Sequence, residues 1–215
     1  MKLTVIGTGG VGQTIGGKLV QLGHEVMMGS RDATNEKGLA WVKASGERAS
    51  LGTFADAASF GELAFNCTAG TASIQALTAA APGLSGKLVI DLTNPLDFSK
   101  GFPPTLFTST TDSLGEQAQR LLANSHVVKA LNHLTASLMV NPKQVGGGDH
   151  DALICGNDAG AKTRVTELLK DWFGWQRVID LGDITGSRAM EQYLSLWLRL
   201  MGSVGTHEFS LKIVK

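Results

Sequence analysis

Cysteine, excess charge and long apolar runs are all scarce in this chain of 215 residues. The two cysteines, Cys67 and Cys155, lie far apart in strand-like runs and form no CxxC pair, so the pattern predicts two buried thiols. The five histidines show no HxH or HExxH spacing, and we expect no metal site. Positive and negative side chains balance at 19 each, which excludes an electrostatic case for nucleic acid or an anionic membrane as partner.

No apolar run is long enough to span a bilayer, and we expect no membrane partner. The first residues enter a strand pattern without a basic n-region or a cleavage site. These features predict a cytoplasmic protein. The length suits one domain, or one domain with a small appendage.

The most informative stretch runs from Lys2 to Arg31. An apolar run leads into Gly7-Thr-Gly9-Gly-Val-Gly12, a helix-period stretch follows, and a second apolar run begins at Glu25. In this G-x-G-x-x-G turn the first glycine allows a tight turn, the second admits a pyrophosphate, and the third lets the helix pack on the strand. The strand before the turn and the helix after it are the context that the motif requires. The turn predicts a dinucleotide site at Gly7, Thr8, Gly9, Gly10, Val11 and Gly12.

The end of the second strand carries the cofactor preference. NAD-specific sites place Asp or Glu there, where a carboxylate binds the ribose 2′-hydroxyl. This chain has Ser30 followed by Arg31, and Lys37 follows in the next predicted helix. A guanidinium suits phosphate oxygens, so we expect NADP(H) rather than NAD(H). The alternative is a solvated surface arginine.

Strands and helices alternate along most of the chain, which predicts an α/β, Rossmann-like, doubly wound and mostly parallel sheet with a small C-terminal helical/αβ appendage. We expect an NADP-binding domain over residues 1–135 and a smaller acceptor-binding or dimerisation region over 136–215. The predicted strands after the first two are Ala49–Leu51, Leu63–Thr68, Lys87–Asp91, His126–Ala130, Asp151–Cys155 and Gln176–Asp180. The predicted helices are Asn35–Ser45, Thr53–Phe60, Thr71–Ala81, Ser113–Leu122, Ala159–Phe173 and most of the chain from Gly186.

Ligands of such sheets bind outside the carboxyl edge of the strands. Three further loops lie there, at Thr68-Ala69-Gly70, Asn94-Pro95-Leu96 and Asn132-His133. A long connection, Leu92–Phe107, follows one strand, and Gly146–Gly148 lies in a stretch that we expect to be mobile, either as a lid hinge or as a flexible loop.

Beyond the shared glycine motif, the chain resembles the coenzyme F420-dependent NADP oxidoreductase family. The resemblance covers nearly the whole chain. It is carried by VIGTGGVGQTIGGKLVQLGHEVMMGSR at the start, then by Ala130-Leu-Asn-His133, Leu153–Asp158, Asp180-Leu-Gly182, Ser187-Arg188 and the closing helices. It implies hydride transfer between NADPH and a deazaflavin or flavin-like acceptor. The glycine turn and the Thr68–Thr71 loop depart from the family pattern, so the acceptor stays open between F420 and another ring.

On that resemblance the glycine turn holds the pyrophosphate, and Ser30, Arg31 and Lys37 hold the 2′-phosphate. Ala69 and Gly70 pass the ribose, Thr68 of the same loop is a further cofactor-binding candidate, and Asn94 and Pro95 lie near the nicotinamide. His133 would lie beside the acceptor ring, and it is the candidate for proton handling. Plain structural interpretations stand beside these: His133 as a residue lining a cleft, and Asn94-Pro95 as an ordinary turn.

The stretch Met190–Met201 is apolar on most sides, and Gln192, Ser195 and Arg199 form too narrow a polar stripe for a helix lying on solvent. Its own chain, a planar ligand or a second subunit must cover it; we expect a homodimer, with core burial as the alternative. No convincing acid–base constellation is present, which favours transfer between two rings. The alternatives are an NADP-dependent reductase of a small imine or carbonyl substrate and a non-catalytic NADP-binding sensor module.

Overall fold

Eight strands form one sheet in the computed structural model, which describes residues 1–215. Their order is β10-β9-β8-β5-β4-β1-β2-β3, and every neighbouring pair is parallel except β8 with β9. The predicted mostly parallel Rossmann-like sheet is therefore confirmed. The strands are β1 (Lys2–Ile6), β2 (Glu25–Ser30), β3 (Ala49–Thr53), β4 (Leu63–Asn66), β5 (Leu88–Asp91), β8 (His126–Ala130), β9 (Asp151–Gly156) and β10 (Arg177–Asp180).

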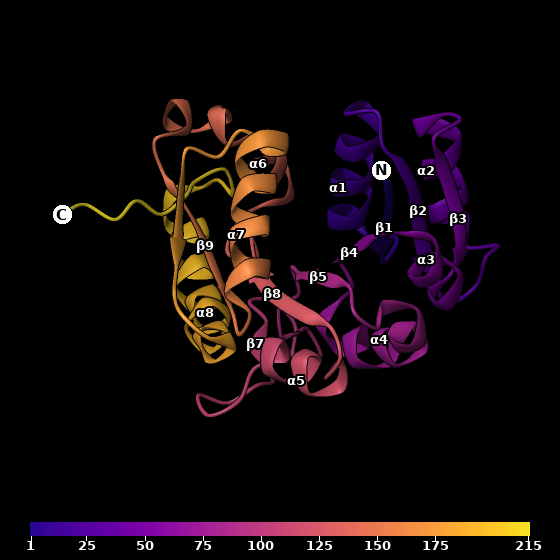
Figure 1. Cartoon of the computed structure of the whole chain (residues 1–215). Helices are drawn as coiled ribbons and strands as arrows, with labels where there is room; N and C mark the ends of the chain where they lie inside the picture. The colour runs from indigo at the N-terminus through magenta and orange to yellow at the C-terminus, as the bar shows by residue number, and fades with distance from the viewer.

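Helices cover both faces of this sheet, as a doubly wound fold requires (Figure 1). One core cluster joins the sheet to α1, α2, α6 and α7, and a second joins it to α3, α4 and α5. A third, small cluster joins β9 to α8. The helices are α1 (Gly10–Gln21), α2 (Glu36–Ser45), α3 (Phe54–Phe60), α4 (Gly70–Leu84), α5 (Leu114–Leu121), α6 (Ala136–Val140), α7 (Ala159–Leu168) and α8 (Ser187–Val204). None of them is long and apolar enough to cross a membrane.

Local sequence explains several helix starts. Asn35 accepts the Gly38 N–H at the start of α2, and Ser113 accepts the Glu116 N–H at the start of α5. Thr53 and Asp56 form a reciprocal capping box at α3. These short polar side chains satisfy backbone donors that have no partner inside the helix.

Three elements differ from the prediction. Helix α4 continues to Leu84 through Pro82, which leaves the carbonyl of Thr78, an exposed residue, without its helical donor. Its last turn also packs closely on α3, where a Cβ on Gly83 would lie 2.8 Å from Ala58. The predicted connection Leu92–Phe107 contains a small antiparallel hairpin, and the helix starting at Ala159 widens to a π-turn over Leu169–Phe173.

Two further segments complete the comparison. The hairpin strands are β6 (Leu96–Asp97) and β7 (Thr105–Leu106). The short helix α6 was not predicted. The residues after Val204 form no helix; they pack back along β9, where the carbonyl of Leu211 accepts the Asp151 N–H. Gly146–Gly148 forms a tight turn with three positive φ angles, and its role as a lid stays a prediction.

The C-terminal part continues the same sheet rather than forming a separate layer. Strands β9 and β10 extend it beyond β8, and Figure 1 shows β4, β5 and β8 between the indigo elements at the N-terminus and the yellow C-terminal part. Phe65 of β4 and Phe173, after α7, lie in one core with ring centroids 6.4 Å apart. The division at residue 135 stays a prediction.

Candidate dinucleotide site

The carboxyl ends of β1, β2 and β4 meet at a cleft with a volume of about 530 Å³. It brings together seven of the predicted residues, which come from three separate loops: Gly7, Thr8, Gly9, Ser30, Arg31, Thr68 and Ala69. Asp32, Asn35, Phe54, Cys67 and Ala72 complete its lining. Gly10, Val11 and Gly12 form the first turn of α1, directly behind Gly9.

Each motif glycine has a distinct reason to lack a side chain. Gly7 has a φ of +113°, and Gly12 lies so close to the turn that a Cβ would be 2.1 Å from the Gly7 oxygen. A Cβ on Gly9 or Gly10 would meet no atom of the chain within 4 Å. Packing explains the first pair, whereas the second pair leaves room for a group that approaches the backbone closely, as a pyrophosphate does.

Two helix N-termini present free backbone donors at this cleft. Neither α1, which begins after Gly9, nor α4, which begins after Ala69, has a side-chain cap or an acidic residue in its first turn. Uncapped N–H groups and the positive end of a helix dipole favour an anion. The residues present therefore fit a dinucleotide pyrophosphate.

The far end of the cleft is cationic. Arg31 is exposed and makes no ion pair, and buried Ser30 lies beside it at the end of β2. The carboxylate of Asp32 accepts hydrogen bonds from the N–H and hydroxyl of Thr34, at 2.8 and 2.7 Å, and these bonds lower the pKa of Asp32. Lys37 is exposed in the first turn of α2 but does not line the cleft.

The Asn94-Pro95 turn lies beside the cleft rather than in its lining. The Asn94 amide N–H donates to the Asn132 carbonyl at 2.7 Å, and its oxygen accepts from the Asn132 amide at 2.9 Å. Pro95 is buried, and Gly70 approaches this turn so closely that a Cβ would lie 2.1 Å from the Asn94 oxygen. The two asparagines thus join the loops after β5 and β8.

His133 is buried, with 1% of its surface exposed, and does not line the cleft. Its Nε2 lies 3.4 Å from the Asp151 carbonyl oxygen, and its ring meets Tyr193 of α8 edge-on. Burial lowers the pKa of His133 to about 4, so the imidazole is neutral near pH 7. Leu131, two residues earlier, has a φ of +59°, an uncommon conformation for a residue with a side chain.

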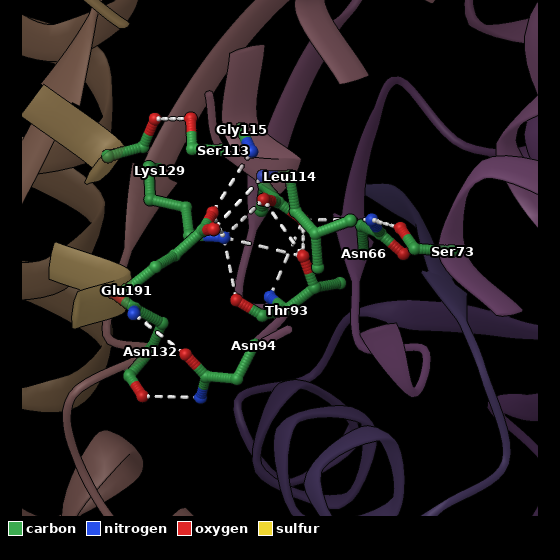
Figure 2. A network of polar contacts seen from close by, with 12 residues as sticks. Asn66, Ser73, Thr93, Asn94, Ser113, Leu114, Gly115, Lys129, Asn132 and Glu191 are labelled. Atoms are coloured by element: carbon green, nitrogen blue, oxygen red, sulfur yellow. Dashed lines mark hydrogen bonds and ion pairs between the residues drawn. The ribbon is translucent and has the colours of Figure 1, made fainter. Parts of the chain in front are cut away.

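A buried ionic network next to these loops was missed by the sequence analysis (Figure 2). The ammonium of Lys129 lies 2.8 Å from Asp91 and 2.9 Å from Glu191, and all three side chains are at most 1% exposed. The network joins β5, β8 and α8. A lysine, an aspartate and a glutamate inside apolar runs were the signal that could have revealed it, because unpaired charges are rarely buried.

The ammonium and the two carboxylates of the network compensate one another electrostatically. Burial by itself lowers the pKa of the Lys129 ammonium, but the two carboxylates outweigh it and the pKa is raised. The carboxylate of Glu191 also accepts the N–H groups of Leu114 and Gly115 at 3.0 and 3.1 Å, so a residue of α8 caps the start of α5. Asp91 accepts further hydrogen bonds from Asn66 and Thr93.

Both cysteines are free and buried, as predicted. Burial raises the pKa of both thiols, to about 12 for Cys155. Neither thiol is therefore ionised near neutral pH, and Cys67 contributes to the cleft as a small apolar side chain.

Comparison with known proteins agrees with this site. Residues 2–95 match the family described as NADP oxidoreductase coenzyme F420-dependent. The chain is 31% identical over 209 residues to an F420-dependent NADP reductase of Methanothermobacter marburgensis, covering 93% of this chain and 92% of that protein. An imine reductase from Streptomyces aurantiacus shares the fold, with a TM-score of 0.67 and 20% identity. The match covers 95% of this chain and 64% of the imine reductase.

The crystal structure of a provisionally named F420-dependent NADP reductase from Arthrobacter sp. FB24 is 49% identical and covers 100% of both chains, with a TM-score of 0.94. Similarity at this level extends through β9, β10 and α8, beyond the glycine motif that many dehydrogenases share. The chain therefore belongs to the F420-dependent NADP reductase family.

Proposed function

We propose that this protein is an oxidoreductase that exchanges a hydride between NADP(H) and F420 or a related flavin-like ring. The observation that carries the proposal is the cleft itself, where uncapped helix N-termini lie at one end and the unpaired guanidinium of Arg31 at the other. Family membership supports the choice of acceptor.

In this proposal the first turn of α1 binds the pyrophosphate, with Gly9 and Gly10 allowing close approach. Ser30 and Arg31 bind the 2′-phosphate, and Lys37 contributes its charge from α2. Thr68, Ala69 and Gly70 lie along the ribose at the start of α4. Asn94 keeps one amide hydrogen beyond its bond to Asn132, and this hydrogen is available to the nicotinamide carboxamide.

Bound NADPH supplies the hydride, and the acceptor ring receives it. The chain must hold two rings in register and exclude water, and orientation contributes most of what such a transfer needs. The hydrogen-bonded pair Asn94–Asn132 and the buried network of Asp91, Lys129 and Glu191 give that region a rigid base. His133 is buried and neutral, and its role is to pack edge-on against Tyr193 rather than to carry a charge at neutral pH.

The test is oxidation of NADPH, followed at its near-ultraviolet absorbance, with F420, FMN, FAD and riboflavin offered separately. We expect turnover with at least one ring acceptor and none with a cyclic imine or a small carbonyl compound. Turnover only with the imine or carbonyl would replace the acceptor class. NADP binding without turnover of any acceptor would favour the sensor alternative.

We also propose a homodimer that covers α8. Leu196, Leu200 and Val204 follow one another at intervals of four on this helix, and their exposed fractions are 54%, 38% and 59%. An apolar stripe of this kind favours a two-fold contact with a second copy. Leu200→Glu should convert the dimer to monomer in sedimentation analysis; a wild-type monomer at micromolar concentration would contradict the proposed dimer.

The two unpaired thiols fit the reducing cytoplasm, where we propose that the protein acts.

A further inference from the structure

The polar stripe of α8 runs along a groove, and Ser195 and Arg199 are exposed at its edge. Gln192, Ser195 and Arg199 line a groove with a volume of about 380 Å³ between α8 and the β6–β7 hairpin. The opposite wall comes from Pro103–Leu106 and from Thr108. The stripe that is too narrow for a helix lying on solvent therefore borders a groove.

The side chains of this groove have unused hydrogen-bonding capacity and one uncompensated charge. Arg199 makes no ion pair, and no aspartate or glutamate lines the groove. The Thr108 hydroxyl is buried without a partner, and such a group is costly unless something binds it. A groove with a guanidinium, three hydroxyls and an amide, and no acid, is suited to an anion.

Both walls of the groove are tied to the turn proposed for the nicotinamide. The Phe107 N–H donates to the Pro95 carbonyl at 2.9 Å, which places Thr108 next to that turn. On the other wall, the Asn132 amide donates to the Met190 carbonyl at 3.0 Å, two residues before Gln192. An acceptor whose ring lies near Asn94 and Asn132 can therefore extend a side chain into the groove.

We propose that this groove binds the phosphoryl group on the acceptor's side chain, with Arg199 as the charged contact and Ser195, Gln192 and Thr108 as hydrogen-bonding partners. This inference rests on the proposed function. F420 carries a phosphodiester on its side chain and FMN a phosphate, whereas riboflavin and the ribityl deazaflavin core of F420 carry neither. The groove thus selects among ring acceptors by their anionic tail.

Binding distinguishes this role without turnover. Fluorescence titration in the presence of NADP⁺ gives the Kd of F420 and of its phosphate-free deazaflavin core. We expect the wild type to bind F420 about 10-fold more tightly than the core. Arg199→Ala should remove this difference and leave the Kd of the core unchanged. Ser195→Asp, at an exposed position, should weaken F420 binding by placing a carboxylate in the groove.

The matched control is Arg164→Ala, which removes an exposed arginine of α7 that pairs only with Glu167. It should leave both affinities unchanged. Equal wild-type affinities for F420 and its core, or a loss with Arg199→Ala that is the same for both, would overturn the groove proposal. If F420 binds more tightly than its core but NADPH is not oxidised, the proposed reaction is overturned and the groove remains a binding site. If NADPH is oxidised but the two affinities are equal, the groove proposal is overturned and the reaction stands.

Discussion

At the scale of single residues, Arg31 and His133 show how position changes the meaning of a side chain. Arg31 directly follows the second strand and lines a cleft where the one nearby acid, Asp32, is already hydrogen-bonded by Thr34. Its charge is therefore free for a ligand. The ring of His133 is enclosed by the chain, so its chemistry is that of a buried neutral imidazole, and its place beside the acceptor stays a prediction.

Arg31→Ala should weaken NADP(H) binding about 10- to 100-fold, because a charge-assisted phosphate contact is worth roughly 1.5–3 kcal/mol. NAD(H) binding should change little, since that cofactor lacks the 2′-phosphate. Isothermal titration with both cofactors measures the effect. The NADP(H) affinity of Arg31→Lys, which keeps the charge but loses the planar fork, should lie between those of the wild type and Arg31→Ala. Equal losses for both cofactors would refute the 2′-phosphate role.

His133 should make the protein less stable in mild acid. Its pKa is about 4 when folded and 6.5 as the reference for the unfolded chain, so the unfolded state binds the proton first. The stability that the neutral form contributes is complete above pH 6.5 and is lost as the pH falls toward 4, by about 3 kcal/mol. Urea unfolding of the wild type and His133→Gln across this window measures the difference, and parallel pH dependences would contradict it.

At the scale of elements, α8 links the C-terminal part to the sheet and to α5. Glu191 accepts two backbone donors at the start of α5 and pairs with Lys129 of β8. One buried carboxylate thus connects a helix, a strand and a helix terminus. On its other sides the same helix presents the groove residues and an exposed apolar stripe.

Glu191→Gln should destabilise the protein by about 3 kcal/mol, because removing one partner leaves the buried lysine charge undercompensated. Chemical unfolding monitored by circular dichroism measures this loss. Glu208→Gln, at an exposed position after α8, is the matched control, and its effect should stay within about 0.5 kcal/mol. Similar small effects in both variants would mean that the network is not required for stability.

At the scale of the whole molecule, one sheet and one large core cross the predicted boundary at residue 135. Leu3 and Phe65 from the first part share a core cluster with Phe173 and Trp175 from the second. Separation would expose apolar surface on both sides. We therefore expect the dinucleotide cleft and the groove on α8 to belong to one cooperative unit.

Equilibrium unfolding should show a single transition, with the same midpoint by tryptophan fluorescence and by circular dichroism. A chain ending at residue 135 should lack a cooperative transition, because it loses β9, one partner of β8, and α6, which packs on α1. Two separated transitions, or a stable fragment 1–135 that binds NADP, would instead establish two folding units.

The sequence by itself determined what depends on neighbours along the chain. The glycine turn, the helix behind it and the Ser30-Arg31 strand end lie within thirty residues or so, and their local conformations follow from glycine and from apolar periodicity. The alternating strands and helices likewise predicted the doubly wound sheet. These inferences held because each needs only local geometry and a general rule for where strand ends meet.

Only the tertiary structure decided what depends on residues distant in sequence. Asp91, Lys129 and Glu191 stand on three elements, and nothing local says that their charges compensate one another. Contacts between distant segments also produce the Asn94–Asn132 hydrogen bonds, the burial of His133 and the groove beside Arg199. Burial and pairing are properties of the packed chain, because the desolvation of a side chain depends on which distant segments cover it.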